Sequence, residues 1–237
     1  MHIAITRPRE DSERTAALLR AQGHRVLLAP LLRVEPVTTA LRANWGAVII
    51  TSAHAAAAMA SHPALKELTR LPLFAVGQRS AEAARAIGFT QVTAAGGDLR
   101  DLTRTIAAAR SDAKAPLLYL AGEDRAGDLI GDLAVHGIAA ELAVVYRAVV
   151  APFAPALTEA LRAGEIDAVL HYSKRSAESF LSGAADAGVA GQALAAKHLC
   201  LSAQVAEPLI AAGARRVDVA ARPDEAALIE LLPPRER

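Results

Sequence analysis

The stretch Ile3-Ala4-Ile5-Thr6, followed by a helix-like segment and then Gly23, recurs later in the chain. The second copy begins with Leu117-Leu118-Tyr119-Leu120, and a gapless alignment places Gly137 on Gly23. Each copy is a short apolar run, a helix-like segment and a glycine, which is the alternation expected of a parallel-sheet α/β fold. We expect Gly23 and Gly137 to end helices, because glycine adopts positive φ without a Cβ clash.

Two further strand-like runs are also duplicated. Ala47–Ser52 aligns with Ala168–Ser173, and Phe74–Gly77 aligns with Leu199–Ser202. Two copies of this size predict two similar α/β domains, and a chain of 237 residues is long enough to give each its own core. Along the chain the three repeated segments follow one another as one, two, three and then one, two, three again. The first segment could therefore fold with the segments that follow it directly, or with those at the far end of the chain.

Two extended stretches bear on this choice. Leu31–Pro36 and Val145–Val150 carry β-branched residues and lie near prolines, which suits extended chain. They are typical of paired connectors, and two connectors favour a discontinuous first domain with a second domain inserted into it. Spacing alone leaves both arrangements open.

Composition excludes several classes of partner. Lysine and arginine (26) balance aspartate and glutamate (25), so no basic face indicates a nucleic-acid partner. The apolar runs fall short of the roughly 18 residues that a membrane span needs, and the first residues lack the pattern of a secretory signal. The single cysteine, Cys200, lies in an apolar run, so we expect a buried thiol and a reducing compartment, which favours the cytoplasm.

Candidate binding residues follow the predicted strands, because ligands of open parallel sheets bind beyond the carboxyl ends of the strands. They share hydroxyl, amide or cationic side chains, or positions where helix N-termini direct backbone N–H groups at an anion. These residues are Thr6, Arg7, Thr51, Ser52, Ala53, Gly77, Arg125, Ser173, Lys174, Ser176, Ser202 and Gln204. A ligand with several carboxylates fits such a lining, although a serine between a strand and a helix, such as Ser52, Ser173 or Ser202, is more often simply a helix N-cap.

The sequence contains no recognisable zinc, P-loop, dinucleotide or nucleophile-elbow motif, so we predict no metal, cofactor or covalent nucleophile. His24, His136 and His198 precede or begin apolar runs and are expected to face solvent or an edge. Tyr146, one of three tyrosines, lies in the second connector. Its phenol either faces a ligand or packs at a domain junction.

Together these features resemble the uroporphyrinogen-III synthase family over essentially the whole chain. The residues that carry the resemblance are Thr6-Arg7-Pro8, Ile50-Thr51-Ser52-Ala53 with Ala55, Ala75-Val76-Gly77 with Ala81 and Gly88, Gly122 with Arg125, Leu129 and Gly137, Val145-Tyr146-Arg147, and Ser173. Their order, spacing and duplication are more specific than any one of them.

The resemblance implies two flavodoxin-like parallel-sheet domains joined by a two-stranded connector. The first domain would be residues 1–35 plus 148–237, and residues 36–147 would be the inserted one, with connectors near 31–37 and 144–151. It also implies a cofactor-free lyase that cyclises hydroxymethylbilane, a linear tetrapyrrole, to uroporphyrinogen III with loss of water and inversion of the last ring.

By the same resemblance Tyr146 would donate a proton to the leaving hydroxyl, while Arg7, Thr51, Ser52, Arg125, Ser173 and post-strand N–H groups would hold carboxylates. A cytoplasmic monomer is expected, with possible transient contact with the preceding pathway enzyme. Where many family members carry Gly-Pro-Thr-Thr, this chain has Ser202-Ala203-Gln204-Val205, so Ser202 or Gln204 would substitute.

Two other functions compete with this interpretation. A non-catalytic two-lobed α/β module that binds a polycarboxylate would present the same anion-friendly loops. A nucleotide-sugar transferase would also have two domains, but we would expect a carboxylate pair or a nucleotide-binding loop, and the sequence shows neither.

Overall fold

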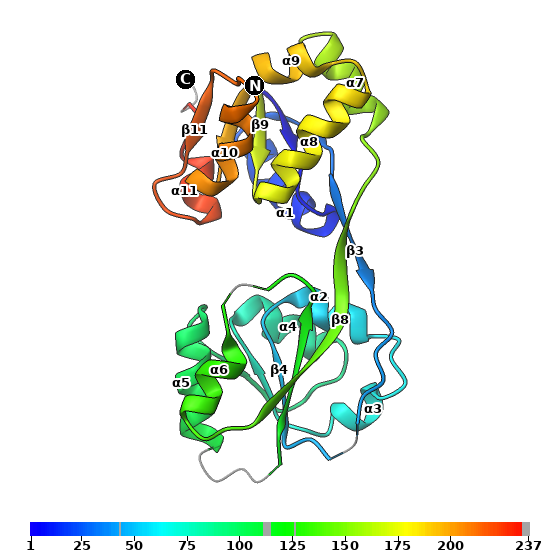
Figure 1. Ribbon diagram of the computed structural model, residues 1–237, viewed down its shortest axis with the longest axis vertical. Helices are drawn as coiled ribbons and strands as arrows, with labels where there is room; N and C mark the ends of the chain where they lie inside the picture. Colours follow the sequence, from blue (N-terminus) through cyan, green and yellow to red (C-terminus); the bar gives the residue numbers. More distant parts are fainter. Residues whose placement is uncertain (43, 111–114, 126, 234–237) are drawn as a thin grey trace. The chain divides into compact units, whose positions relative to one another are not determined.

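The computed structural model describes residues 1–42, 44–110, 115–125 and 127–233. The chain divides into two compact units (Figure 1). Unit 1 comprises Met1–Arg33 and Val149–Arg237, and unit 2 comprises Val34–Ala148. Unit 1 is therefore built from both ends of the chain, and each unit is described by itself below.

Within the described residues, the sheet of unit 1 has five strands in the order β11-β10-β9-β1-β2, and every neighbouring pair is parallel. The strands are β1 (His2–Ile5), β2 (Arg25–Leu28), β9 (Ala168–His171), β10 (Lys197–Cys200) and β11 (Val217–Val219). Consecutive residues of a strand face opposite sides, so Ile3 and Ile5 enter one core and Ala4 enters the other. Both faces are buried, as parallel sheets require.

Helices cover both faces of this sheet. One core packs α7 (Pro155–Arg162), α8 (Lys174–Asp186), α9 (Ala190–Ala195) and α10 (Ala203–Ala211) against the strands. The other core holds α1 (Arg9–Ala21) and α11 (Glu225–Ile229). The result is a three-layered α/β/α unit.

In the described part of unit 2, the sheet order is β3-β8-β7-β4-β5-β6. The strands are β3 (Leu32–Pro36), β4 (Ala47–Ile50), β5 (Leu73–Ala75), β6 (Val92–Ala94), β7 (Leu117–Gly122) and β8 (Ala140–Val150). The pairs from β8 through β6 are all parallel. One face carries α2 (Ala53–Met59), α3 (Leu65–Leu68) and α4 (Gln78–Ala86), and the other carries α5 (Leu99–Arg110) and α6 (Leu129–Val135).

Strand β3 is the exception, because it pairs with β8 in the opposite direction. Val37 N–H donates to the Val145 carbonyl (2.8 Å), and Ala151 N–H donates to the Leu31 carbonyl (2.9 Å). Residue numbers therefore increase along one strand where they decrease along the other, which makes the pair antiparallel. Figure 1 shows β3 and β8 side by side where the chain passes between the units.

The two sheets share one strand order once the circular offset is taken into account. Unit 1 reads β2-β1-β9-β10-β11, and the parallel part of unit 2 reads β8-β7-β4-β5-β6. If counting begins at β1 and at β7, both are 2-1-3-4-5, the order of flavodoxin-like sheets. The predicted α/β fold with parallel sheets is confirmed.

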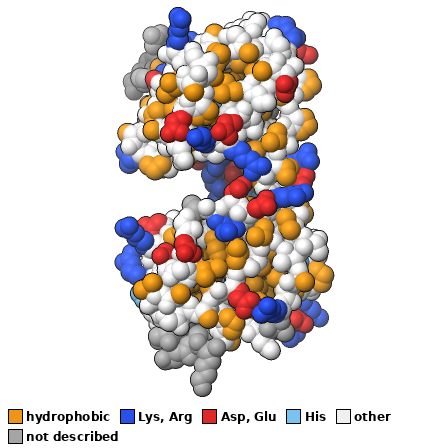
Figure 2. Space-filling model, viewed as in Figure 1, with side chains coloured by type: hydrophobic (Ala, Val, Ile, Leu, Met, Phe, Trp, Pro, Cys, Tyr) orange, Lys and Arg blue, Asp and Glu red, His pale blue; other side chains and the backbone are white. Residues whose placement is uncertain are grey.

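The local signals agree with the structure in part. Gly23 and Gly137 both adopt positive φ (79° and 71°) directly after helices. Cys200 is buried, as expected. On the face shown in Figure 2, acidic and basic side chains are interspersed. No helix among the described residues has the length and apolarity to span a membrane.

The expectation that His198 faces solvent is wrong. His198 is fully buried in β10, and its Nδ1 lies 3.1 Å from Nε2 of His171 in the neighbouring strand β9. The ring of Phe180 packs edge-on against both imidazoles. Burial lowers the pKa of His198 to about 4, and burial and the neighbouring His198 lower the pKa of His171 well below its usual value. Both rings are therefore neutral in the folded protein at neutral pH.

This pair predicts acid sensitivity of unit 1. The pKa of each histidine is lower when folded than when unfolded, so the unfolded state binds protons first, and stability falls as pH drops from about 6.5 towards 4. His198 alone should account for about 3 kcal/mol of this loss. Urea unfolding followed by far-UV circular dichroism at several pH values measures it.

Trp45, the one tryptophan of the chain, is buried in unit 2 and gives a separate fluorescence signal for that unit. His136→Asn, at an exposed position, should keep the wild-type pH dependence, whereas His171→Leu/His198→Leu should flatten it. A wild-type stability that stays level between pH 6.5 and 4 would contradict the prediction.

Candidate functional site at the strand ends

Each sheet has one place where its strand order reverses, and ligands of open α/β sheets bind at the carboxyl ends of the strands there. In unit 2 this place lies between β4 and β7, and in unit 1 between β9 and β1. The residues just beyond these strand ends form the candidate site, taken separately for each unit.

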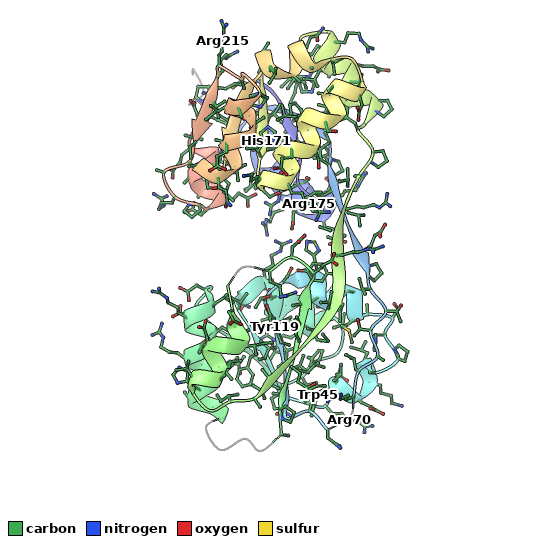
Figure 3. The ribbon with its side chains drawn as sticks, viewed as in Figure 1. Trp45, Arg70, Tyr119, His171, Arg175 and Arg215 are labelled. Atoms are coloured by element: carbon green, nitrogen blue, oxygen red, sulfur yellow. The ribbon has the colours of Figure 1, made fainter. Side chains whose placement is uncertain are left out.

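Thr51 directly follows β4, and its hydroxyl lies 2.9 Å from the phenol oxygen of Tyr119 in β7. The strand register explains the contact. Ile49 pairs with Tyr119, and Thr51 is two residues beyond Ile49, so all three side chains lie on one side of the sheet. The long Tyr119 side chain spans the remaining distance from inside the core, where the residue is 4 % exposed. It projects from β7 within unit 2 (Figure 3).

The environment of Tyr119 keeps its phenol protonated. Burial is the main cause that raises its pKa, and the Tyr146 phenol adds to the rise. The hydrogen bond to Thr51 and the charge of Arg125 act in the opposite direction. The net effect is a pKa above the ordinary value near 10, so the phenol keeps its proton at neutral pH and is able to donate it in a hydrogen bond.

Tyr146 lies in β8 opposite Gly122, where the ladder between β7 and β8 shifts register. A Cβ atom on Gly122 would lie 2.6 Å from Cζ of the Tyr146 ring, so the absence of a side chain makes room for the phenol. The ring also lies near that of His54, with 5.8 Å between the ring centroids. Tyr146 is half-buried and thus held at the strand ends of unit 2 while remaining accessible.

The other predicted residues of unit 2 shape the surrounding loops. Ser52 caps α2 by accepting a hydrogen bond from the His54 N–H (3.2 Å), and Ala53 is the first residue of that helix. Arg125 donates to the carbonyls of Gly122 (3.0 Å) and Glu123 (2.9 Å), which fixes the turn after β7. Gly77 precedes α4 and has no polar side chain to offer, so only its backbone could meet a ligand.

In unit 1, the side chains of two predicted binding residues form contacts within the protein. The fully buried Thr6 hydroxyl donates to the Leu170 carbonyl (2.7 Å) and so ties β1 to β9. Arg7 lies 2.8 Å from Glu225 and 3.6 Å from Asp11, and its guanidinium stacks 4.3 Å above the Tyr172 ring. The charge of Arg7 is already compensated by these two carboxylates.

The start of α8 combines a structural cap with an exposed cation. The Ser173 hydroxyl oxygen accepts from the Ser176 N–H (3.1 Å), and the Ser173 N–H donates to the Ser176 hydroxyl oxygen (3.3 Å), which completes a capping box. Lys174 is exposed and forms an ion pair with Glu207 (2.9 Å), which raises its pKa. The capping explanation therefore applies to Ser173.

Helix α10 differs, because Ser202 stands at its N-cap without a side-chain capping hydrogen bond. Gln204 lies in the first turn of the same helix and is exposed. These two polar side chains remain close to the carboxyl end of β10. In the described ranges no group of three acidic, histidine or cysteine side chains could hold a metal ion.

Sequence reasoning missed Tyr119. Its position inside an apolar run indicated a core residue, and only the register between β4 and β7 shows that its hydroxyl reaches Thr51. Aromatic residues make up only 3 % of the chain, and Tyr119 is one of three tyrosines. This scarcity was the one signal in the sequence that could have drawn attention to Tyr119.

The Arg7 network predicts a measurable coupling between Arg7 and Glu225. In a double-mutant cycle with Arg7→Gln and Glu225→Gln, we expect a coupling energy of about 1 kcal/mol, because both side chains are largely buried. Arg9 and Glu13 form an exposed control pair, for which a few tenths of a kcal/mol is expected. Urea unfolding followed by circular dichroism measures both cycles, and an equal coupling for the two pairs would contradict a structural role of Arg7.

Comparison with known proteins identifies relatives. The family model described as uroporphyrinogen-III synthase HemD matches residues 13–230. A search of curated proteins gave no significant match.

Solved structures agree in fold. The uroporphyrinogen-III synthetase of Helicobacter pylori is similar with a TM-score of 0.66 and 20 % identity, over 97 % of each chain. A mutant uroporphyrinogen III synthase of Thermus thermophilus gives 0.51 and 19 %, over 97 % of this chain and 96 % of that one. At these identities the structures support the fold, and the family rests on the model match.

Proposed function

This chain belongs to the uroporphyrinogen-III synthase family, and on that premise we propose how its own residues carry out the reaction. The family consists of cyclising lyases of porphyrin and haem biosynthesis. They close linear hydroxymethylbilane into uroporphyrinogen III, with loss of water and inversion of the last pyrrole ring. The match over residues 13–230 covers nearly the whole chain and carries the assignment. It does not favour a non-catalytic binding module.

The reaction requires no covalent bond between the protein and the substrate. A pyrrole carbon of the substrate is the nucleophile, and the hydroxyl on the terminal carbon leaves as water once it receives a proton. The protein must supply that proton, hold a strained spiro-type intermediate and bind many carboxylates. Hydroxyl groups, arginine, lysine and backbone N–H groups are suited to these tasks.

We assign the proton donation to Tyr146. Its ring lies against Gly122 and near His54 at the carboxyl edge of the unit 2 sheet, and it is half-buried and therefore reachable. The phenol would give its proton to the leaving hydroxyl and recover one from the pyrrole carbon when aromaticity is restored.

Carboxylate binding is proposed for strand-end side chains that are exposed or half-buried and carry hydrogen-bond donors. In unit 2 these are the Thr51 hydroxyl and the Arg125 guanidinium, with backbone N–H groups after Ser52 and Gly77. In unit 1 they are Lys174, Ser202 and Gln204, with N–H groups at the start of α8 and α10. Thr6, Arg7, Ser173 and Ser176 would support these loops through the contacts described above.

We further propose a cytoplasmic monomer that meets the preceding pathway enzyme transiently. Among the described residues the exposed large hydrophobic side chains are few and widely separated in sequence, such as Leu18, Val135 and Ile210, which suits a monomer. The buried thiol of the single cysteine suits a reducing compartment.

The activity and the role of Tyr146 are tested together. With freshly generated hydroxymethylbilane, wild type should give mainly type III porphyrin after oxidation, whereas the spontaneous product is type I. Tyr146→Phe should lower kcat on the order of 100-fold with little change in KM, because it removes only the proton donor. Chromatographic separation of the two isomers measures both.

Gly122→Ala provides a second variant, since its Cβ would displace the Tyr146 ring. Gly191→Ala is the matched control, because a Cβ there meets nothing within 4 Å. Gly122→Ala should lower kcat and Gly191→Ala should not. Only type I product from folded wild type would overturn the proposed activity, and full activity of Tyr146→Phe would overturn the role of Tyr146.

A further inference from the structure

The hydrogen bond between Tyr119 and Thr51 has a direction that the surroundings determine. The phenol oxygen of Tyr119 lies 2.9 Å from Oγ1 of Thr51, and in the described part of the chain Thr51 is its one hydrogen-bond partner. A phenol has a single proton, and a buried polar group left without a partner is costly. If Thr51 were the donor, the phenol proton would lie unpaired in the core of unit 2. Tyr119 is therefore the donor and Thr51 the acceptor.

This direction determines where the Thr51 proton can point. Oγ1 already accepts from Tyr119, so the Thr51 hydroxyl can donate its own proton to another acceptor. Thr51 is half-buried and is the first residue beyond β4, where the strand order reverses. It thus presents a donor at the position where ligands of such sheets bind.

We propose that Tyr119 is a positioning residue, whose hydrogen bond to Thr51 directs the Thr51 hydroxyl proton towards a carboxylate of the tetrapyrrole substrate. This inference rests on the proposed function. Tyr119 itself does not touch the substrate, because it is 4 % exposed. A chain of two hydroxyls ending on a carboxylate is a charge-assisted arrangement in which each bond polarises the next.

The local electrostatics agree with this role. Burial holds the pKa of Tyr119 above its ordinary value, so the phenol keeps the proton that it donates. Arg125 acts on the same phenol and is itself anchored to the turn after β7, so a cation accompanies the hydroxyl pair at these strand ends. A carboxylate at Thr51 would meet a directed O–H donor close to a positive charge.

The alternative is that Tyr119 merely fills the core. Tyr119 belongs to the same buried cluster as Ile49, Leu117 and Leu133, on the side of the sheet that carries α5 and α6. Tyr119→Phe retains the aromatic ring and removes only the hydroxyl, so a packing role predicts unchanged substrate binding. A positioning role predicts weaker substrate binding, seen as a higher KM, with little change in kcat.

The test is a double-mutant cycle on KM for hydroxymethylbilane, with Tyr119→Phe, Thr51→Val and the double variant. Tyr119→Phe should raise KM roughly fivefold, as expected for one lost hydrogen bond. In the Thr51→Val background it should have no further effect, because the hydroxyl that it orients is gone. In the Thr51→Ser background the rise should return.

Thr103→Val is the matched control, since it removes a largely buried hydroxyl from α5 of the same unit, where the partner is the Leu99 carbonyl. Its KM should equal that of wild type, and Trp45 fluorescence confirms that unit 2 of each variant is folded. An unchanged KM for Tyr119→Phe or for Thr51→Val, or equal rises in both backgrounds, would overturn the inference. If the wild type gave only the type I isomer, the proposed function would fail and this inference with it. If the wild type gave type III product but the KM of Tyr119→Phe were unchanged, only the positioning role of Tyr119 would be overturned.

Discussion

The parallel pairing of β4 with β7 is the constraint on which the candidate site depends. These strands are distant in sequence, yet their register sets Ile49 against Tyr119 and so places Thr51 within hydrogen-bonding distance of the phenol. The same strand β7 ends at Gly122, whose missing side chain leaves room for Tyr146 of β8. A slip of one residue in either pair would turn these side chains to the opposite face and separate the hydroxyls.

The two units share one strand order but present different side chains at their strand ends. In unit 1 the arginine after β1 is neutralised by Glu225 and Asp11, and the threonine beside it is fully buried. In unit 2 the equivalent edge presents a half-buried tyrosine and a half-buried threonine. The duplication explains the shared fold, while the side chains at the strand ends differ between the copies. Fold alone would not have indicated the activity.

Much of the fold could be predicted from the sequence, because apolar runs, helix-ending glycines and the repeat are local or periodic signals. Gly23 and Gly137 end helices as expected, and Ser52 and Ser173 are N-caps. The site was less predictable, because it depends on pairing between distant strands. The polar role of Tyr119 could not be predicted for this reason. His198 was expected at the surface because its partner His171 lies in a different strand.

The most direct measurement of the central claim is a map of backbone amide NMR shifts as the isotope-labelled protein binds uroporphyrinogen III under reducing, anaerobic conditions. The account predicts the largest changes at the carboxyl ends of the strands, at Thr51, Gly122 and Tyr146 in unit 2 and at Lys174 and Gln204 in unit 1. Gly46 and Asp167, which precede β4 and β9, should change little. Changes concentrated at these amino ends, with Thr51 and Tyr146 unaffected, would contradict it.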